Sequence, residues 1–114
     1  MGRSRAVEIV ASACCAPLLA APLDARDANE LARAFKALAD PVRLQLLSLI
    51  AASPGGRACS CDLEAPVGKS QPTVSHHLSL LAEAGLITKV KQGRWVLCSI
   101  VPGRLGALRD ALSG

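Results

Sequence analysis

The hydrophobic pattern of this chain changes its period at Gly85, and that change constrains the fold more than any other feature. Upstream, three apolar residues recur at the spacing of one helix face: Val74, Leu78 and Leu81. Ser70 precedes them as a suitable N-cap. Downstream, apolar and polar residues alternate in LITKVKQGRWVLCSIV, which predicts two short strands around Gln92-Gly93. We therefore expect a helix that leads directly into a β-hairpin.

Helical spacing also predicts the rest of the chain. The sequence becomes helical from Asp24, and Asp40 is the expected N-cap of a second helix with Pro41 at its first position. Asp62 to Val67 is read as a short helix, and Pro102 to Ser113 as the last one. The residues expected on the buried faces are Leu31, Ala34, Phe35 and Leu38, then Leu44, Leu47 and Ile50 or Ala51, and finally Leu105, Leu108 and Leu112.

Length and composition indicate one small, mainly helical domain. A chain of 114 residues suits a single domain, and with one Phe and one Trp its core must consist of Leu, Ala, Val and Ile. Two prolines, Pro17 and Pro22, limit regular helix near the start. We expect residues 1–23 to form an N-terminal arm that carries Cys14 and Cys15, and residues 24–114 to form the folded domain.

Two short helices, a tight turn and a hairpin describe a winged helix-turn-helix, an α+β but mainly helical fold with a two-stranded β-hairpin wing. The helix after Ser70 keeps short hydrogen-bonding side chains away from its apolar face, which suits contacts to base edges in a major groove. The basic hairpin suits phosphate contacts beside it. The candidate DNA-binding residues are Ser70, Gln71, Thr73, Ser75, His76, His77 and Ser79 on the helix and Lys89, Lys91 and Arg94 on the hairpin.

Charge and cysteine usage agree with an intracellular DNA-binding protein. The formal net charge is +4, which fits nucleic-acid binding without requiring it. Five cysteines, an odd number with closely spaced pairs, argue against a secreted disulfide framework. Glu8 interrupts the apolar run near the N-terminus, and no run is long enough to cross a membrane, so we expect a cytoplasmic protein. The sequence contains no recognisable nucleophile–base pair and no phosphate-binding loop, so we do not expect an enzyme.

Four cysteines are candidate ligands for a thiophilic ion, namely Cys14, Cys15, Cys59 and Cys61. Each pair can face one ion only where the backbone is extended or irregular, because residues two apart diverge on a helix. The start of the short helix is expected to lower the pKa of Cys61. Cys98 alternates with Val96 and Ile100 on a strand and is assigned to the core. His76 and His77 are assigned to DNA rather than to metal.

Four stretches together resemble the ArsR/SmtB family of bacterial metal-sensing repressors over residues 27–101. They read FKALADPVRLQLLSLI, CSCDL, SQPTVSHHLSLLAEAGLI and KQGRWV. The resemblance implies a homodimer assembled from the first and last helices. It also implies an operator with two half-sites on double-stranded DNA, and repression that is relieved when a metal or metalloid binds.

The resemblance to the arsenic-responsive branch implies the inducer. In that branch a third cysteine often follows the pair, but Glu64 stands there in this chain, and the Cys14-Cys15 pair resembles an arm that completes the site with a cysteine of the other subunit. We therefore expect trivalent arsenic or antimony as the inducer, with no organic cofactor. A four-thiolate cadmium or lead sensor and a thiol redox sensor are the alternatives. The last helix lacks the histidines of zinc-type and nickel-type relatives.

Overall fold

The computed structural model describes residues 17–19 and 21–113. Five α-helices, two short 3₁₀-helices and three strands follow one another in this part of the chain. In order they are α2 (Ala25–Leu38), α3 (Pro41–Ala52), η1 (Pro54–Gly56), β1 (Arg57–Cys59), η2 (Ser60–Asp62), α4 (Glu64–Val67), α5 (Gln71–Glu83), β2 (Ile87–Gln92), β3 (Trp95–Ile100) and α6 (Pro102–Ala111).

Aspartates begin the first two helices, as the sequence predicted for Asp40. The Asp24 carboxylate accepts a hydrogen bond from the backbone N–H of Asp27 at 2.8 Å, and the Asp40 carboxylate accepts one from Arg43 at 3.1 Å. Pro41 occupies the first turn of α3, where its missing N–H costs nothing. The hydrogen bond from the Arg43 backbone holds the pKa of Asp40 below its usual value of 3.8, because it favours the charged carboxylate.

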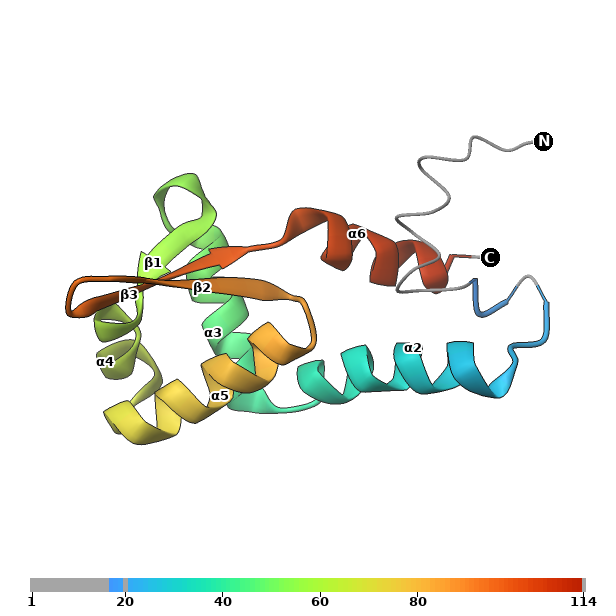
Figure 1. Ribbon diagram of the computed structural model, residues 1–114, viewed down its shortest axis with the longest axis horizontal. Coiled ribbons are helices and arrows are strands. Elements are labelled where there is room, and N and C mark those ends of the chain that lie inside the picture. Colours follow the sequence, from blue (N-terminus) through green and yellow to red (C-terminus); the bar gives the residue numbers. More distant parts are fainter. Residues whose placement is uncertain (1–16, 20, 114) are drawn as a thin grey trace.

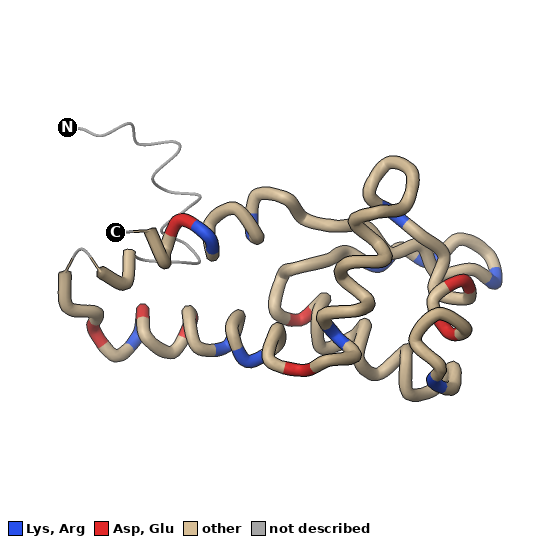
Figure 2. The backbone as a smooth tube through the Cα atoms, turned by 180° about the vertical axis from the view of Figure 1, so that it is seen from behind, with Lys and Arg blue, Asp and Glu red and all other residues tan. Residues whose placement is uncertain are grey.

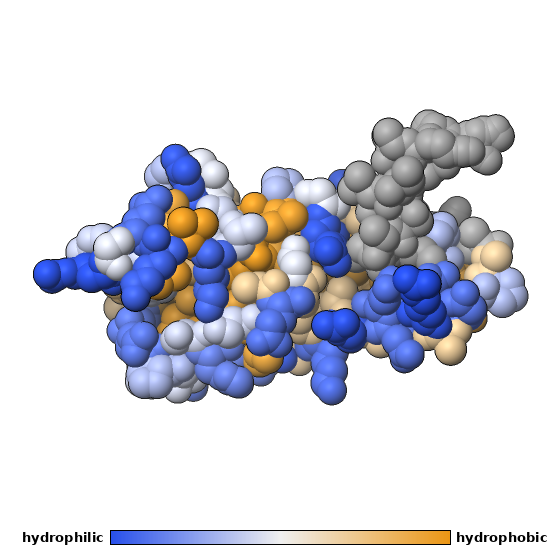
Figure 3. Space-filling model, viewed as in Figure 1, coloured by the Kyte–Doolittle hydropathy of each residue, from blue (hydrophilic) through white to orange (hydrophobic). Residues whose placement is uncertain are grey.

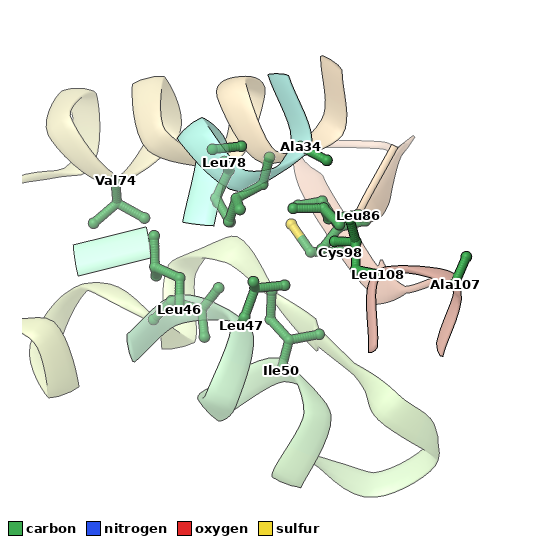
Figure 4. Close-up of a cluster of buried hydrophobic side chains, with 14 of the residues drawn as sticks. Ala34, Leu46, Leu47, Ile50, Val74, Leu78, Leu86, Cys98, Ala107 and Leu108 are labelled. Atoms are coloured by element: carbon green, nitrogen blue, oxygen red, sulfur yellow. The ribbon is translucent and has the colours of Figure 1, made fainter. Parts of the chain in front are cut away.

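The core lies between α3, α5 and the sheet (Figure 4). The side chains that are almost completely buried are Leu46, Ile50, Val74, Leu78, Leu81, Leu86, Ile87 and Cys98. The core assignment of Cys98 is confirmed, and burial raises the pKa of its thiol. The buried face of α3 differs from the predicted one, because Leu44 is 52% exposed and Leu46 is buried in its place. So many apolar residues occupy α3 that their spacing alone does not select one face.

The sheet has three strands in the order β1-β3-β2, so the prediction of a two-stranded wing was incomplete. Gly55 and Gly56 adopt φ angles of 70° and 69°, a conformation that favours glycine and returns the chain from α3 into β1. β1 pairs antiparallel with β3 and sets Cys59 opposite Leu97. The hairpin between β2 and β3 was predicted correctly, although its turn lies at Gly93 and Arg94, one residue later.

Helices α2 and α6 extend away from the sheet toward the same side of the molecule (Figure 1). Three small or aliphatic residues of α6 are buried, namely Ala107, Leu108 and Ala111. Leu112, which was predicted on the buried face, is 52% exposed just beyond the helix end. The backbone N–H of Leu18 donates to the carbonyl of Ala111 at 3.0 Å, so the chain ahead of α2 is attached to the end of α6. Among the described residues, none of the helices has the length and apolar run needed to cross a bilayer.

The two leucines of α3 give a direct test of the packing. We expect Leu46→Ala to lower the free energy of unfolding by about 2–5 kcal/mol, since it leaves a cavity in the core. Leu44→Ala, the same change at an exposed site on the same helix, should change it by about 0.5 kcal/mol or less. Urea denaturation of both variants measures the difference, and equal losses would contradict the assigned face of α3.

The Asp40 cap predicts a specific dependence of stability on pH. Because the folded state lowers the pKa of this carboxyl, its contribution is fully present above the unfolded value near 3.8 and is lost as the pH falls through the lower folded value. Asp40→Asn keeps a capping side chain but removes the charge. The stability difference between wild type and Asp40→Asn should therefore shrink in acid. A difference that stays constant between neutral and acid pH would refute this role of the charge.

Candidate DNA interface and thiol site

The predicted base-reading surface lies on α5, and most of it faces outward. Ser70 caps the helix by accepting a hydrogen bond from the Thr73 backbone, and both residues are exposed together with Gln71 and His76. Ser75 is half-buried. The sequence of α5 contains no lysine or arginine, so this surface offers hydrogen-bond donors and acceptors rather than positive charge.

His77 lies differently from the outward position expected for it. Its side chain is only 17% exposed, and its Nδ1 lies 3.1 Å from Nη1 of Arg43 and 3.9 Å from a carboxylate oxygen of Asp40. The same arginine donates to the carbonyl of Ala37 at 2.6 Å and to that of Lys36 at 3.3 Å. Arg43 therefore joins the end of α2 and the start of α3 to the middle of α5.

The hairpin supplies the positive charge that α5 lacks. Lys91 and Arg94 are exposed near its tip, and one more exposed basic residue, Lys69, lies in the turn ahead of α5 (Figure 2). Lys89 is exposed too, but its Nζ donates to the Ser79 hydroxyl on α5 at 2.7 Å. This bond holds β2 against α5, so the positions of the hairpin and the helix are coupled.

Cys59 and Cys61 meet at the junction of β1 and η2. Cys59 has extended backbone angles and ends the strand, and Cys61 lies in the 3₁₀ turn that follows. This irregular backbone brings their Sγ atoms to 2.6 Å, where they share a hydrogen bond. The backbone here is therefore irregular, as it must be if both sulfurs are to face one ion. Cys59 is half-buried and Cys61 is exposed.

Asp62 joins the two thiols as a third potential ligand. One of its carboxylate oxygens lies 3.9 Å from the Cys61 sulfur, and the ligand atoms of all three residues lie within 4.8 Å of one another. Asp62 belongs to the CSCDL stretch but was not predicted as a ligand. Its position next to Cys61 was the signal available. Glu64, one turn later, begins α4.

The expected lowering of the Cys61 pKa was wrong. The hydrogen bond with Cys59, partial desolvation and the neighbouring Asp62 carboxylate raise the pKa of Cys61 to about 11. The helix that follows is too short, at four residues in α4, to oppose these effects with a strong dipole. Cys61 therefore keeps its proton at neutral pH.

The thiols are joined to the DNA surface by very few residues. Cys61 is followed by α4, and Gly68 ends α4 in a left-handed conformation before Ser70 begins α5. Leu63, between the thiols and α4, is 2% exposed and belongs to the core. Cys14 and Cys15, the other predicted ligands, lie outside the described residues.

Comparison with known proteins agrees with this arrangement. Residues 40–89 match the model for the bacterial regulatory proteins of the arsR family. An uncharacterised HTH-type transcriptional regulator of Methanocaldococcus jannaschii is 42% identical over 77 residues, which are 68% of this chain and 84% of the relative. The arsenical resistance operon repressor of Escherichia coli is 46% identical over 68 residues, 60% of this chain but only 56% of the repressor.

Solved structures give the same result. The antimony-specific transcriptional repressor AntR superposes with a TM-score of 0.65 at 33% identity, over 81% of this chain and 83% of AntR. A homodimeric winged helix-turn-helix DNA-binding domain from Mycobacterium bovis superposes with a TM-score of 0.61 at 26% identity, over 80% of this chain and 82% of that domain. The chain therefore belongs to the arsR family of bacterial regulatory proteins, which are DNA-binding transcriptional regulators of the winged helix-turn-helix fold and not enzymes.

Proposed function

We propose that this protein is a cytoplasmic repressor that binds operator DNA as a homodimer and leaves it when trivalent arsenic or antimony binds its cysteine thiolates. The observation that carries the proposal is the thiol pair of Cys59 and Cys61, whose sulfurs lie 2.6 Å apart directly ahead of α4 and α5. Relatives named for arsenical resistance and for antimony support the choice of ion. Soft thiolates prefer such thiophilic ions.

We assign two kinds of DNA contact to the interface. The exposed or half-buried polar side chains near the start of α5 read base edges: Ser70, Gln71, Thr73, Ser75 and His76. Lys91 and Arg94 contact phosphates, and Lys89 and Ser79 keep the hairpin in place beside the helix through their hydrogen bond. His77 acts through Arg43, because their contact at 3.1 Å sets the rotation of α5 against α2 and α3.

The proposed ion site needs at least one thiolate in addition to those of Cys59 and Cys61. Trivalent arsenic takes three thiolates in the arsenical branch that the sequence resembles, and Cys59 and Cys61 supply two. We assign the remainder to the Cys14-Cys15 pair in the arm of residues 1–23. A cadmium or lead site would use all four cysteines, and this alternative is separated from the arsenic site by the ion panel below.

The contact between Leu18 and Ala111 indicates which subunit donates the arm. Cys15 is three residues from Leu18, a reach of about 11 Å at most. Ala111 lies at the far end of α6, about 15 Å of helix beyond β3. Leu97, opposite Cys59, lies about 10 Å further back along the strand. Since β3 and α6 run in the same direction (Figure 1), the arm falls short of its own Cys59, and we assign it to the Cys59 and Cys61 of the partner subunit.

Induction then follows from linkage between the two sites. The free dimer holds its two α5 helices at the spacing of the operator half-sites. Ion binding fixes the partner's arm to the η2 turn, next to Leu63 in the core, and favours a dimer shape that fits DNA less well. A coupling free energy of about 1–3 kcal/mol, which is typical of allostery, weakens DNA binding about 5- to 150-fold.

Substitutions in the DNA interface should separate base contacts from phosphate contacts. We expect Gln71→Ala and His76→Ala to cost about 1–3 kcal/mol on the operator with little effect on random DNA. Lys91→Ala and Arg94→Ala should weaken binding to both and reduce the salt dependence by about one charge each. Arg26→Ala, a basic side chain on α2 that is 86% exposed, is the matched control and should change neither. Fluorescence anisotropy at several salt concentrations measures these effects.

A mixed dimer tests whether the ion site crosses the subunits. One subunit carries Cys14→Ser and Cys15→Ser, and the other carries Cys59→Ser and Cys61→Ser, so a site shared between subunits survives once and a site within one subunit does not survive at all. We expect arsenite to release the mixed dimer from DNA. Neither homodimer of the two doubly substituted subunits should respond. An unresponsive mixed dimer would rule out the crossed site.

The same release assay identifies the ion. Arsenite and antimonite are expected to release the wild-type protein, and Cys98→Ala, a change in the core away from the ligands, is expected to keep that response. Release by cadmium or lead alone would favour the four-thiolate alternative. Release by peroxide with loss of free thiols, counted by mass spectrometry, would favour the redox alternative.

A further inference from the structure

The outer face of the sheet beside the thiols contains an open hollow of about 410 Å³. Cys59, Cys61, Trp95 and Leu97 are among its lining residues. Because Cys59 pairs with Leu97 across β1 and β3, both side chains lie on one face of the sheet, opposite the face that carries buried Cys98. Trp95 is two residues from Leu97 on the same strand and shares its face.

Part of the apolar wall of this hollow is open to solvent in the described part of the chain. Trp95 is 54% exposed, and Val96 and Leu97 beside it are half-buried. Hydrophobic side chains are visible over the strands, between hydrophilic ones (Figure 3). An exposed indole beside two thiols is therefore a surface suited to an apolar group attached to whatever the thiols bind.

We propose that this hollow makes Cys59 and Cys61 a site for monosubstituted trivalent arsenicals with an aromatic substituent, held within one subunit. The inference rests on the proposed role of these thiols as ligands. Such a compound, R–As(OH)₂, has only two exchangeable positions. Its two As–O bonds break, two As–S bonds form, and the two thiol protons leave with the hydroxides as two water molecules. Arsenic stays trivalent throughout, so no oxidant or reductant is needed.

The geometry matches this ligand in two respects. Two sulfurs 2.6 Å apart are close enough to bind one arsenic atom, and no third thiolate is required. The carbon substituent then projects from the sulfurs into the hollow, where the Trp95 ring and the Leu97 side chain can cover it. Inorganic arsenite lacks a substituent and gains nothing from this surface. The arm cysteines are therefore needed for arsenite but not for the aromatic arsenical.

Binding of phenylarsine oxide to the full-length homodimer tests the proposal. Trp95 is the only tryptophan of the chain, so its fluorescence reports directly on a ligand in the hollow. We expect 1:1 binding per subunit with a change in Trp95 emission, both retained in the variant with Cys14→Ser and Cys15→Ser and both abolished by Cys59→Ser with Cys61→Ser. The first variant should at the same time lose its response to arsenite, as the proposed function requires.

Side-chain variants isolate the hollow from the thiols. In competition with a dithiol, followed by mass spectrometry, Trp95→Ala should weaken phenylarsine oxide binding about three- to tenfold and leave arsenite binding unchanged. Leu44→Ala, an exposed apolar residue on α3 outside the lining of the hollow, is the matched control and should affect neither ligand.

Each outcome distinguishes this inference from the proposed function. Equal affinities in the wild type and in Trp95→Ala would overturn the substituent site, even if arsenite still releases DNA. If the variant without Cys14 and Cys15 no longer binds phenylarsine oxide, the site formed by Cys59 and Cys61 alone is overturned. Conversely, binding that depends on Trp95 together with no release of DNA by arsenite would support the inference while refuting the proposed function.

Discussion

The pairing of β1 with β3 is the interaction on which the candidate site depends. Three residue pairs form it, and the last of them sets Cys59 opposite Leu97. Without this short strand, the chain after α3 would be a loop and the two thiols would have no fixed direction. With it, Cys59 ends on the sheet that also forms the hairpin, and Cys61 begins the turn into α4 and α5. One ladder therefore attaches the two thiols to both elements that are proposed to contact DNA.

The second constraint is the way α5 is held. Val74, Leu78 and Leu81 fix it to the core, while Arg43 and Lys89 hold it from two sides through His77 and Ser79. Polar contacts of this kind are directional, so they set the rotation of the helix more sharply than apolar packing does. This property suits the proposed regulation, because a small movement of the supporting elements then moves the predicted base-reading surface with them.

Most of the helices and the hairpin were predictable because local signals specify them. The capping role of Asp40, the turn at Gly85 and the change of period all act over a few residues. The strand β1 was missed because three residues are too few to show a period, and its pairing with β3 joins residues about forty positions apart. The buried face of α3 was misplaced for another reason: Leu44, Leu46 and Leu47 are equally apolar, and only tertiary contacts choose among them.

The chemistry of the two thiols was predictable only in part. The sequence indicated that Cys59 and Cys61 could share an ion only on irregular backbone, and a strand end followed by a 3₁₀ turn meets that condition. The pKa of Cys61 was predicted to fall because the prediction took account of the helix start but not of the neighbouring Cys59 and Asp62 side chains. A thiol 2.6 Å away and a carboxylate at 3.9 Å outweigh the partial charge of a four-residue helix. The hydrogen bond between the two thiols favours the protonated form of Cys61, and a thiophilic ion in the proposed site has to displace the thiol protons to bind. The closeness of the two sulfurs, which suits the proposed shared ion, thus also keeps Cys61 protonated in its absence.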